Sequence, residues 1–170
     1  AVKLAEAFSR EDISLVFGGG SIGIMGIMAD EILRRDGQAI GVIPRFLYDL
    51  EVGHDGVTDL VIVDSMHERK QKMAEISDAF IALPGGFGTL EEMAEILTWI
   101  QLKLIRKPIG ILNIAGFFDP FLKQLDHMVE TGFLKKNNRD ILIVETDPFR
   151  IVEKLRQSPT FTADKWREKT

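Results

Sequence analysis

The feature that most constrains the fold of this chain is the regular alternation of short apolar runs with longer helical patterns. The apolar runs are rich in Val and Ile, and several lack polar residues, which is typical of strands covered on both faces. Strand then helix, repeated along the chain, predicts an α/β fold with a doubly wound, mainly parallel sheet and helices on both faces. The predicted strands are 13–17, 39–43, 60–63, 79–83, 109–112 and 141–144, and the predicted helices are 22–35, 66–77, 89–104, 117–131 and 147–157.

The length of the chain, 170 residues, fits one domain with a substantial buried core. We therefore predict a single domain over residues 1–170. Residues 1–10 have the pattern of an amphipathic helix, whereas a parallel-sheet protein is expected to begin with a strand. We expect a first strand and its loop to be missing before residue 1, and the polar segment 158–170 to be a peripheral tail.

Composition and charge exclude several classes of function. The net charge of −5 argues against a general nucleic-acid binder, and the absence of cysteine excludes disulfides, thiolate metal sites and cysteine nucleophiles. The three histidines, His54, His67 and His127, show no metal-ligand spacing, so we predict no metal site, and we also predict no cofactor. No apolar run has membrane-spanning length and no signal peptide opens the chain, so we expect a cytoplasmic protein with no membrane partner.

A first glycine-rich loop, Gly18–Gly26, follows a predicted strand and opens a predicted helix. Glycine permits close backbone approach, and unpaired N–H groups at a helix start attract anions. Gly18, Gly20 and Gly23 also fit the dinucleotide spacing G-x-G-x-x-G, but the next strand lacks the acidic residue that this motif requires at its end. Arg45 lies there and leaves NADP binding weakened but open. A tight turn that needs glycine for packing is the structural alternative.

A second glycine loop, residues 83–92, has the sequence LPGGFGTLEE and again joins a predicted strand to a predicted helix. Its three glycines expose backbone donors, and the dipole of the helix expected to begin at Thr89 favours an anion, so the loop predicts a phosphate site. It is not a Walker A loop, because no Gly-Lys-Ser/Thr follows. Thr89-x-x-Glu92 also matches a capping box, in which Glu92 would only satisfy a backbone N–H.

The third segment, residues 64–70, has the sequence DSMHERK and follows a predicted strand. Ser65-x-x-Glu68 is a capping-box pattern and predicts a helix that starts directly after Ser65. Arg69 and Lys70 then lie near the helix start, where cations oppose the dipole unless an anionic ligand is present. An exposed basic helix face is the alternative. Because ligands bind beyond the carboxyl ends of parallel strands, all three segments are candidates for one site.

In this order, GGGSIGIMG, MHERK and PGGFGTLEE resemble the LOG (Lonely Guy) family of cytokinin riboside 5′-monophosphate phosphoribohydrolases, often labelled lysine decarboxylase-like. The resemblance covers about residues 4–155 and implies a Rossmann-like fold, a homodimer or larger assembly, and release of free base from a nucleoside 5′-monophosphate. It places the family's catalytic arginine on Arg69 and its catalytic glutamate on Glu92. The substrate-binding set that loops and resemblance predict is Gly20, Ser21, Gly23, Glu51, Met66, Arg69, Lys70, Gly85, Gly86, Phe87, Gly88, Thr89, Leu90, Glu91, Glu92 and Thr98.

The predicted chemistry is cleavage of an N-glycosidic bond through a sugar cation that resembles an oxocarbenium ion. Glu92 is expected to stabilise this cation and to activate a water, while Gly85–Thr89 holds the 5′-phosphate. Arg69 is expected to orient the phosphate, the ribose or the leaving base. One carboxylate–cation pair at ~4 Å and an effective dielectric of ~20 is worth about 4 kcal/mol, roughly a thousandfold in rate.

Three other functions compete with this prediction. A pyridoxal-phosphate decarboxylase is disfavoured because nothing marks a Schiff-base lysine, and a dehydrogenase because the acidic residue is missing. A non-catalytic nucleotide-binding or carrier protein of the same fold would keep the glycine loops without needing both Arg69 and Glu92. The sequence leaves open whether the base is adenine or an N6-modified adenine, and whether the assembly is a dimer or a hexamer. The apolar helix around Trp99 is the predicted interface.

Overall fold

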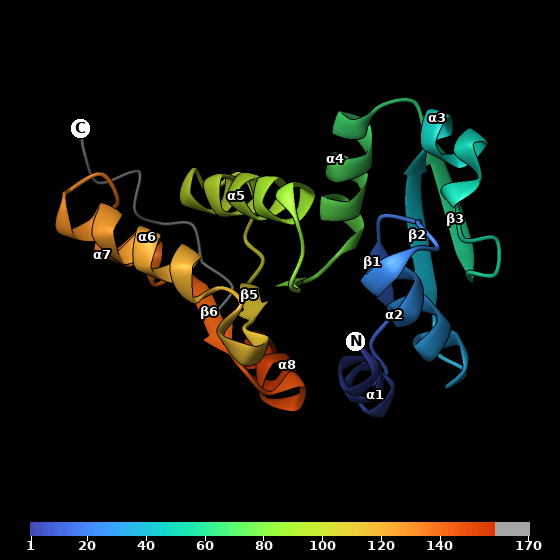
Figure 1. Ribbon diagram of the computed structural model, residues 1–170, viewed down its shortest axis with the longest axis horizontal. Helices are drawn as coiled ribbons and strands as arrows, with labels where there is room; N and C mark the ends of the chain where they lie inside the picture. The colour runs from blue at the N-terminus through green and yellow to red at the C-terminus, as the bar shows by residue number, and fades with distance from the viewer. Residues whose placement is uncertain (159–170) are drawn as a thin grey trace. The chain divides into compact units, whose positions relative to one another are not determined.

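In the described part of the chain, residues 1–158, a computed structural model shows two three-stranded parallel sheets with helices packed against them (Figure 1). At residues 51 and 52 the description covers the backbone alone. The chain divides into an N-terminal unit, Ala1–Ser77, and a C-terminal unit, Asp78–Thr170. Each unit is considered by itself.

The N-terminal unit carries the sheet with strand order β1-β2-β3, in which both strand pairs are parallel. Helix α4 contacts all three strands, whereas α2 contacts β1, β2 and helix α1. The elements are α1 (Val2–Arg10), β1 (Leu15–Phe17), α2 (Gly23–Leu33), β2 (Ala39–Pro44), the short helix α3 (Arg45–Leu47), the π-helical turn η1 (Tyr48–Val52), β3 (Asp59–Val63) and α4 (Met66–Ile76).

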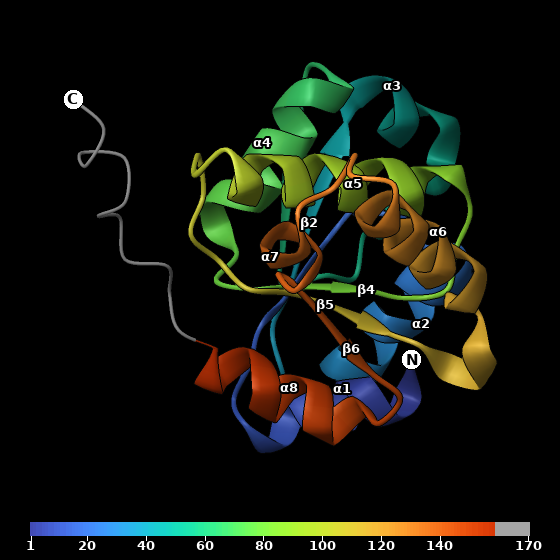
Figure 2. The ribbon, with the colours of Figure 1, turned by 90° about the vertical axis from the view of Figure 1, so that its left-hand side faces the viewer.

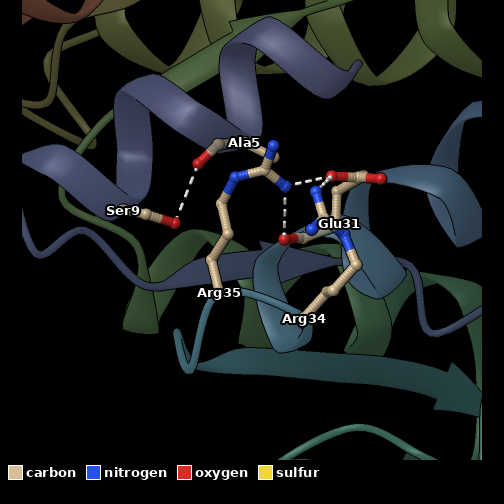
Figure 3. Close-up of polar contacts among 5 residues, drawn as sticks. All are labelled: Ala5, Ser9, Glu31, Arg34 and Arg35. Atoms are coloured by element: carbon tan, nitrogen blue, oxygen red, sulfur yellow. Dashed lines mark hydrogen bonds and ion pairs between the residues drawn. The ribbon is translucent and has the colours of Figure 1, made fainter.

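A cluster of ion pairs lies at the C-terminal end of α2, beside α1. Figure 3 shows the carboxylate of Glu31 held by two arginines: Nη2 of Arg34 lies 2.7 Å from Oε2, and Arg35 pairs with the same oxygen. Arg35 also donates to the main-chain oxygen of Glu31 at 2.9 Å, near the last carbonyls of the helix. The two arginines therefore satisfy acceptors at a helix C-terminus, where cations are favoured.

The C-terminal unit repeats the same plan with strand order β4-β5-β6, again all parallel. Figure 2 shows α5 and α6 on one side of this sheet and α8 on the other. The elements are β4 (Phe80–Ala82), α5 (Phe87–Gln101), β5 (Ile109–Leu112), the 3₁₀ turn η2 (Ile114–Gly116), α6 (Asp119–Glu130), α7 (Lys136–Arg139), β6 (Leu142–Glu145) and α8 (Pro148–Gln157).

Alternation along β5 explains how both faces of this sheet are covered. Ile109 and Ile111 join a buried cluster with Met93 of α5, against which α6 residues also pack. Gly110, which points to the other face, lies against α8, where a Cβ would come within 3.0 Å of the side chain of Ile151. Successive strand residues point to opposite faces, so a small residue here lets α8 approach closely.

The predicted α/β class, with parallel sheets flanked by helices, is confirmed, and every predicted element occurs within about three residues of its predicted bounds. The short elements α3, η1, η2 and α7 were not predicted. A single domain over 1–170 stays a prediction, and the predicted tail lies outside the described residues except for Ser158. None of the described helices combines the length and the apolar character needed to cross a membrane.

Candidate functional site

Arg69 lies in the first turns of α4 and is buried, with 8% of its surface exposed. Its Nε donates to the main-chain oxygen of Val42 in β2 at 3.1 Å, and Nη1 lies 4.0 Å from Sδ of Met66. An arginine with this environment is not part of an exposed basic helix face, so that alternative is wrong for Arg69. A buried guanidinium needs hydrogen-bond acceptors, and the main-chain oxygen of Val42 in β2 supplies one, so the fold itself fixes the position of the Arg69 side chain.

Gly18 makes room for this guanidinium at the end of β1. A Cβ at this position would lie 1.7 Å from Nη2 and 2.8 Å from Cζ of Arg69, far inside van der Waals contact. The guanidinium thus lies against bare backbone, which only glycine offers. The structure therefore brings the first glycine loop and the DSMHERK segment together at one edge of the N-terminal sheet, as predicted from the ends of parallel strands.

The start of α4 is fixed by the capping pattern that the sequence predicted. Oγ of Ser65 accepts from the N–H of Glu68 at 3.1 Å, and Oε2 of Glu68 accepts from the N–H of Asp64 at 2.8 Å. The first bond satisfies a donor that a helix start leaves without an intrahelical partner, and the second reaches the residue before the N-cap instead of the N-cap itself. Because these bonds set Met66 as the first helical residue, Arg69 lies at the fourth position of α4.

The first glycine loop is shaped by its own chain. Gly19 and Gly23 have φ of +72° and +69°, a region that side chains disfavour. Gly20 forms an isolated antiparallel bridge with Gly53, and the N–H of His54 donates to the oxygen of Gly19 at 2.9 Å. These observations favour the tight turn that was the structural alternative, while substrate contact at this loop stays a prediction.

The second glycine loop begins its helix earlier than predicted. Helix α5 starts at Phe87 with Gly86 as N-cap, so Thr89 lies in the first turn rather than at the cap. The capping-box interpretation of Glu92 is therefore wrong. Gly85 has a packing reason, because a Cβ there would lie 2.2 Å from Oγ1 of Thr89.

Gly86 and Gly88 have no such reason. A Cβ at either position would meet no heavy atom within 4 Å, and neither residue has a positive φ. At Gly88, inside the first turn, glycine lowers helix stability by about 1 kcal/mol relative to alanine, whereas at Gly86, the N-cap, glycine is among the favoured residues. The neighbouring Phe87 is 92% exposed, so this helix start presents open backbone whose first N–H groups have no intrahelical acceptor.

Glu92 lies one turn beyond Gly88 on the same face of α5. Helical Cα–Cβ bonds point towards the helix N-terminus, so the carboxylate leans back over the turn that carries Gly88. Glu92 is partly buried, whereas the adjacent Glu91 is exposed. Helix α5 therefore offers an anion-binding start and, one turn along, a carboxylate.

The remaining predicted residues are spread over both units. Thr98 donates to the oxygen of Ala94 within α5 at 2.7 Å. The side chain of Glu51 lies outside the described residues; its backbone belongs to η1. Of the others, Ser21, Gly23, Met66, Gly85, Leu90, Glu91 and Thr98 are exposed, Gly20 is buried, and Lys70, Thr89 and Glu92 are partly buried.

Sequence reasoning missed His54, which it took for one of three scattered histidines. The only local signal is that His54 directly follows a glycine in the segment between the predicted strands 39–43 and 60–63. Its contacts join residues far apart in the sequence, which no local pattern encodes. Among residues 1–158, apart from the side chains of 51 and 52, no three His, Asp or Glu residues gather as a metal site would require.

Comparison with known proteins gives a consistent set of relatives. Residues 25–155 match the family described as "Possible lysine decarboxylase". "Cytokinin riboside 5′-monophosphate phosphoribohydrolase LOG" of Oryza sativa subsp. japonica is 45% identical over 157 residues, which cover 92% of this chain and 65% of that protein. "Probable cytokinin riboside 5′-monophosphate phosphoribohydrolase LOGL2" of the same organism is 41% identical, with 92% and 64% covered. The chain thus spans just under two thirds of the length of these two relatives.

Solved structures of the same fold include two proteins of molybdenum cofactor handling. The molybdenum cofactor binding protein of Rippkaea orientalis matches with a TM-score of 0.68 and 21% identity, over 91% of this chain and 83% of that one. The molybdenum cofactor carrier protein of Chlamydomonas reinhardtii matches with a TM-score of 0.63 and 21% identity, over 92% and 86%. At this identity the likeness establishes the fold alone.

Proposed function

Because the chain belongs to the LOG family, matched under the description "Possible lysine decarboxylase", we propose that it hydrolyses the bond between base and ribose of a nucleoside 5′-monophosphate. The observation that carries this proposal is the start of α5. Its two glycines that no packing requires leave backbone donors open, and a carboxylate follows one turn later. This combination suits a substrate that has a phosphate at one end and a developing sugar cation near it.

In the proposed reaction, the N–H groups at the start of α5 hold the 5′-phosphate. The bond between C1′ and the base nitrogen breaks, its electron pair leaves with the base, and the base gains a proton. Glu92 stabilises the cation at C1′ and takes a proton from the water whose oxygen bonds to C1′. The products are free base and ribose 5-phosphate, and the reaction needs no metal or cofactor.

Arg69 is proposed to orient the phosphate, the ribose or the leaving base. Its support is the buried setting between Gly18 and Val42, which fixes the guanidinium in one place. A preorganised cation contributes more to a reaction than one on a mobile surface side chain, because little reorganisation is needed. The relatives' names point to cytokinin riboside 5′-monophosphates as substrates to try, and AMP is the unmodified nucleotide that the sequence also predicts.

The test is a product assay with Glu92→Gln. Purified protein is incubated with AMP and with N6-isoprenylated AMP, and free base is separated from nucleotide by chromatography. We expect Glu92→Gln to lower base release by ~10²-fold or more while nucleotide affinity changes little, because the carboxylate acts mainly in the transition state. Glu95→Gln, a matched change on the same helix, is the control.

Two results would contradict the proposal. Normal turnover by Glu92→Gln would remove Glu92 from the chemistry. Nucleotide binding by the unmodified protein with no base released from either substrate would favour a carrier of the same fold.

The homodimer, the interface around Trp99 and the cytoplasmic location stay predictions, which light scattering and fractionation of the native source would test.

A further inference from the structure

His54 lies where the chain returns from η1 towards β3, and its side chain is only 12% exposed. Its ring meets the ring of Phe17 edge-on, with centroids 6.4 Å apart and planes at 88°. Phe17 is the buried last residue of β1, directly before the first glycine loop. The histidine is therefore packed against the strand end from which that loop departs.

Main-chain bonds tie the same segment to the loop itself. The N–H of His54 donates to the oxygen of Gly19 at 2.9 Å, and Gly53 pairs with Gly20 in an isolated antiparallel bridge. These contacts hold two residues of the loop on one short piece of chain. Gly19 has a positive φ and a glycine follows it, so the loop has much conformational freedom to lose.

Both ring nitrogens of His54 have partners. The N–H of Gly56 donates to Nδ1 at 3.2 Å, so Nδ1 is the acceptor and Nε2 carries the proton. Nε2 in turn lies 3.0 Å from Oδ1 of Asp30 in α2 and donates to it. One side chain thus connects the end of β1, helix α2 and the returning loop.

We infer that His54 is a positioning residue, which holds the first glycine loop in the conformation that binds the nucleotide. The inference rests on the proposed function, because the loop it holds supplies the predicted substrate contacts Gly20, Ser21 and Gly23. A loop that occupies the competent conformation only a tenth of the time binds its ligand about tenfold more weakly. The loss falls on binding, because the loop contacts substrate and transition state alike.

The kinetic test compares three variants of His54 with AMP as substrate. His54→Ala removes the ring contact with Phe17 and both ring hydrogen bonds, and we expect KM to rise about tenfold with kcat within about twofold of the unmodified protein. His54→Asn keeps an acceptor near the Nδ1 position for Gly56, and His54→Gln keeps a donor that can reach Asp30. In each of these two variants KM should rise less than in His54→Ala. His127→Ala is the control, since His127 is an exposed histidine that also lies beside a carboxylate.

A second measurement needs no substrate. Amide hydrogen exchange of the nucleotide-free protein, followed peptide by peptide, should be faster in His54→Ala over residues 18–23 and unchanged over 109–112 in β5. A merely structural role would instead lower the melting temperature and speed exchange throughout the N-terminal unit, with KM unaltered. Unchanged exchange at 18–23, or an unaltered KM in all three variants, overturns the inference.

The two claims fail in different ways. If the unmodified protein neither binds nor cleaves AMP or N6-isoprenylated AMP, the proposed function falls, and with it the role of His54 in nucleotide binding. If it cleaves AMP and the His54 variants keep the normal KM, only the inference falls. Should His54→Ala fail to fold, the Asn and Gln variants carry the same comparison.

Discussion

In the N-terminal unit the protein's own atoms occupy the place of a side chain at Gly18 and Gly19, in the loop after β1, whereas in the C-terminal unit Gly86 and Gly88, in the loop after β4, face open space. A side chain at Gly18 would collide with Arg69, and one at Gly19 would come within 3.0 Å of Ile43. A side chain at Gly86 or Gly88 would meet nothing. Both loops join a strand to a helix, and from sequence they looked alike.

The difference separates two uses of glycine. Where the protein itself occupies the place of a side chain, packing explains the residue completely. At Gly88, which lies inside the helix with an ordinary φ and with no atom where a side chain would be, glycine lowers helix stability for no internal gain, and approach of a ligand is the physical reason that remains. In the N-terminal unit the first loop therefore makes room for an arginine, and in the C-terminal unit the second loop leaves open the backbone to which we propose that a phosphate binds.

The largest effect should follow from filling the first loop. Gly18→Ala places a methyl group 1.7 Å from Nη2 of Arg69, so the guanidinium must leave its place beside Val42. We expect stability to fall by about 1–3 kcal/mol, as for other overpacked sites, and base release to fall by ~10²-fold because the arginine is displaced. Urea unfolding and the AMP product assay measure the two effects.

A double-mutant cycle isolates the cause. In an Arg69→Ala background the methyl group at residue 18 meets no guanidinium, so Gly18→Ala should then lower stability much less than it does alone. If the stability losses simply add, the collision with Arg69 is not what makes glycine necessary there, and the contrast between the two loops loses its first half.

Filling the second loop should have the opposite effect on stability. Gly88→Ala adds a methyl group that meets no atom of the protein, and alanine favours the helix by about 0.5–1 kcal/mol. If the phosphate approaches this backbone, KM for AMP should nevertheless rise about tenfold, equal to about 1.4 kcal/mol of lost binding. Thermal unfolding and steady-state kinetics with AMP provide both values.

The exposed residue Ala94, further along α5, provides the matched control. Ala94→Gly should lower stability by about 1 kcal/mol and leave KM unaltered, the reverse of the expected result at Gly88. A Gly88→Ala variant that is more stable and binds AMP normally would show that the open space at this helix start serves no ligand.

Sequence reasoning located the strands and helices because hydrophobic periodicity and capping patterns are local signals. It placed the start of α5 too late, because Gly86 caps the helix without a side chain, while the pattern at Thr89 imitated a cap. It identified Arg69 but not the contact of its guanidinium with the backbone of Gly18, because that contact joins residues about fifty positions apart in the sequence. His54 escaped for the same reason: its ring contacts lie on β1, on α2 and in its own loop, and only the folded chain brings these together.

The smallest expected effect is the loss of stability in acid, which one carboxylate in each unit should show. Hydrogen bonds from Arg34 and then Arg35 lower the pKa of Glu31 in the N-terminal unit to about 2, and a bond from Lys154 lowers the pKa of Glu145 in the C-terminal unit. Each carboxylate is more acidic in the folded state, so its contribution to stability is complete above the unfolded pKa and decreases as pH falls towards the folded pKa.

Urea unfolding between pH ~7 and ~3 of the unmodified protein, Glu31→Gln and Glu145→Gln measures these contributions. The stability gap between the unmodified protein and Glu31→Gln should be constant above pH ~5 and should narrow steadily below it, because the unfolded carboxylate takes up its proton first. The gap for Glu145→Gln should narrow in the same direction. A stability gap for Glu31→Gln that does not change with pH would mean that Arg34 and Arg35 do not hold the Glu31 carboxylate in solution. Water competes with ion pairs near the surface, so this outcome is physically open.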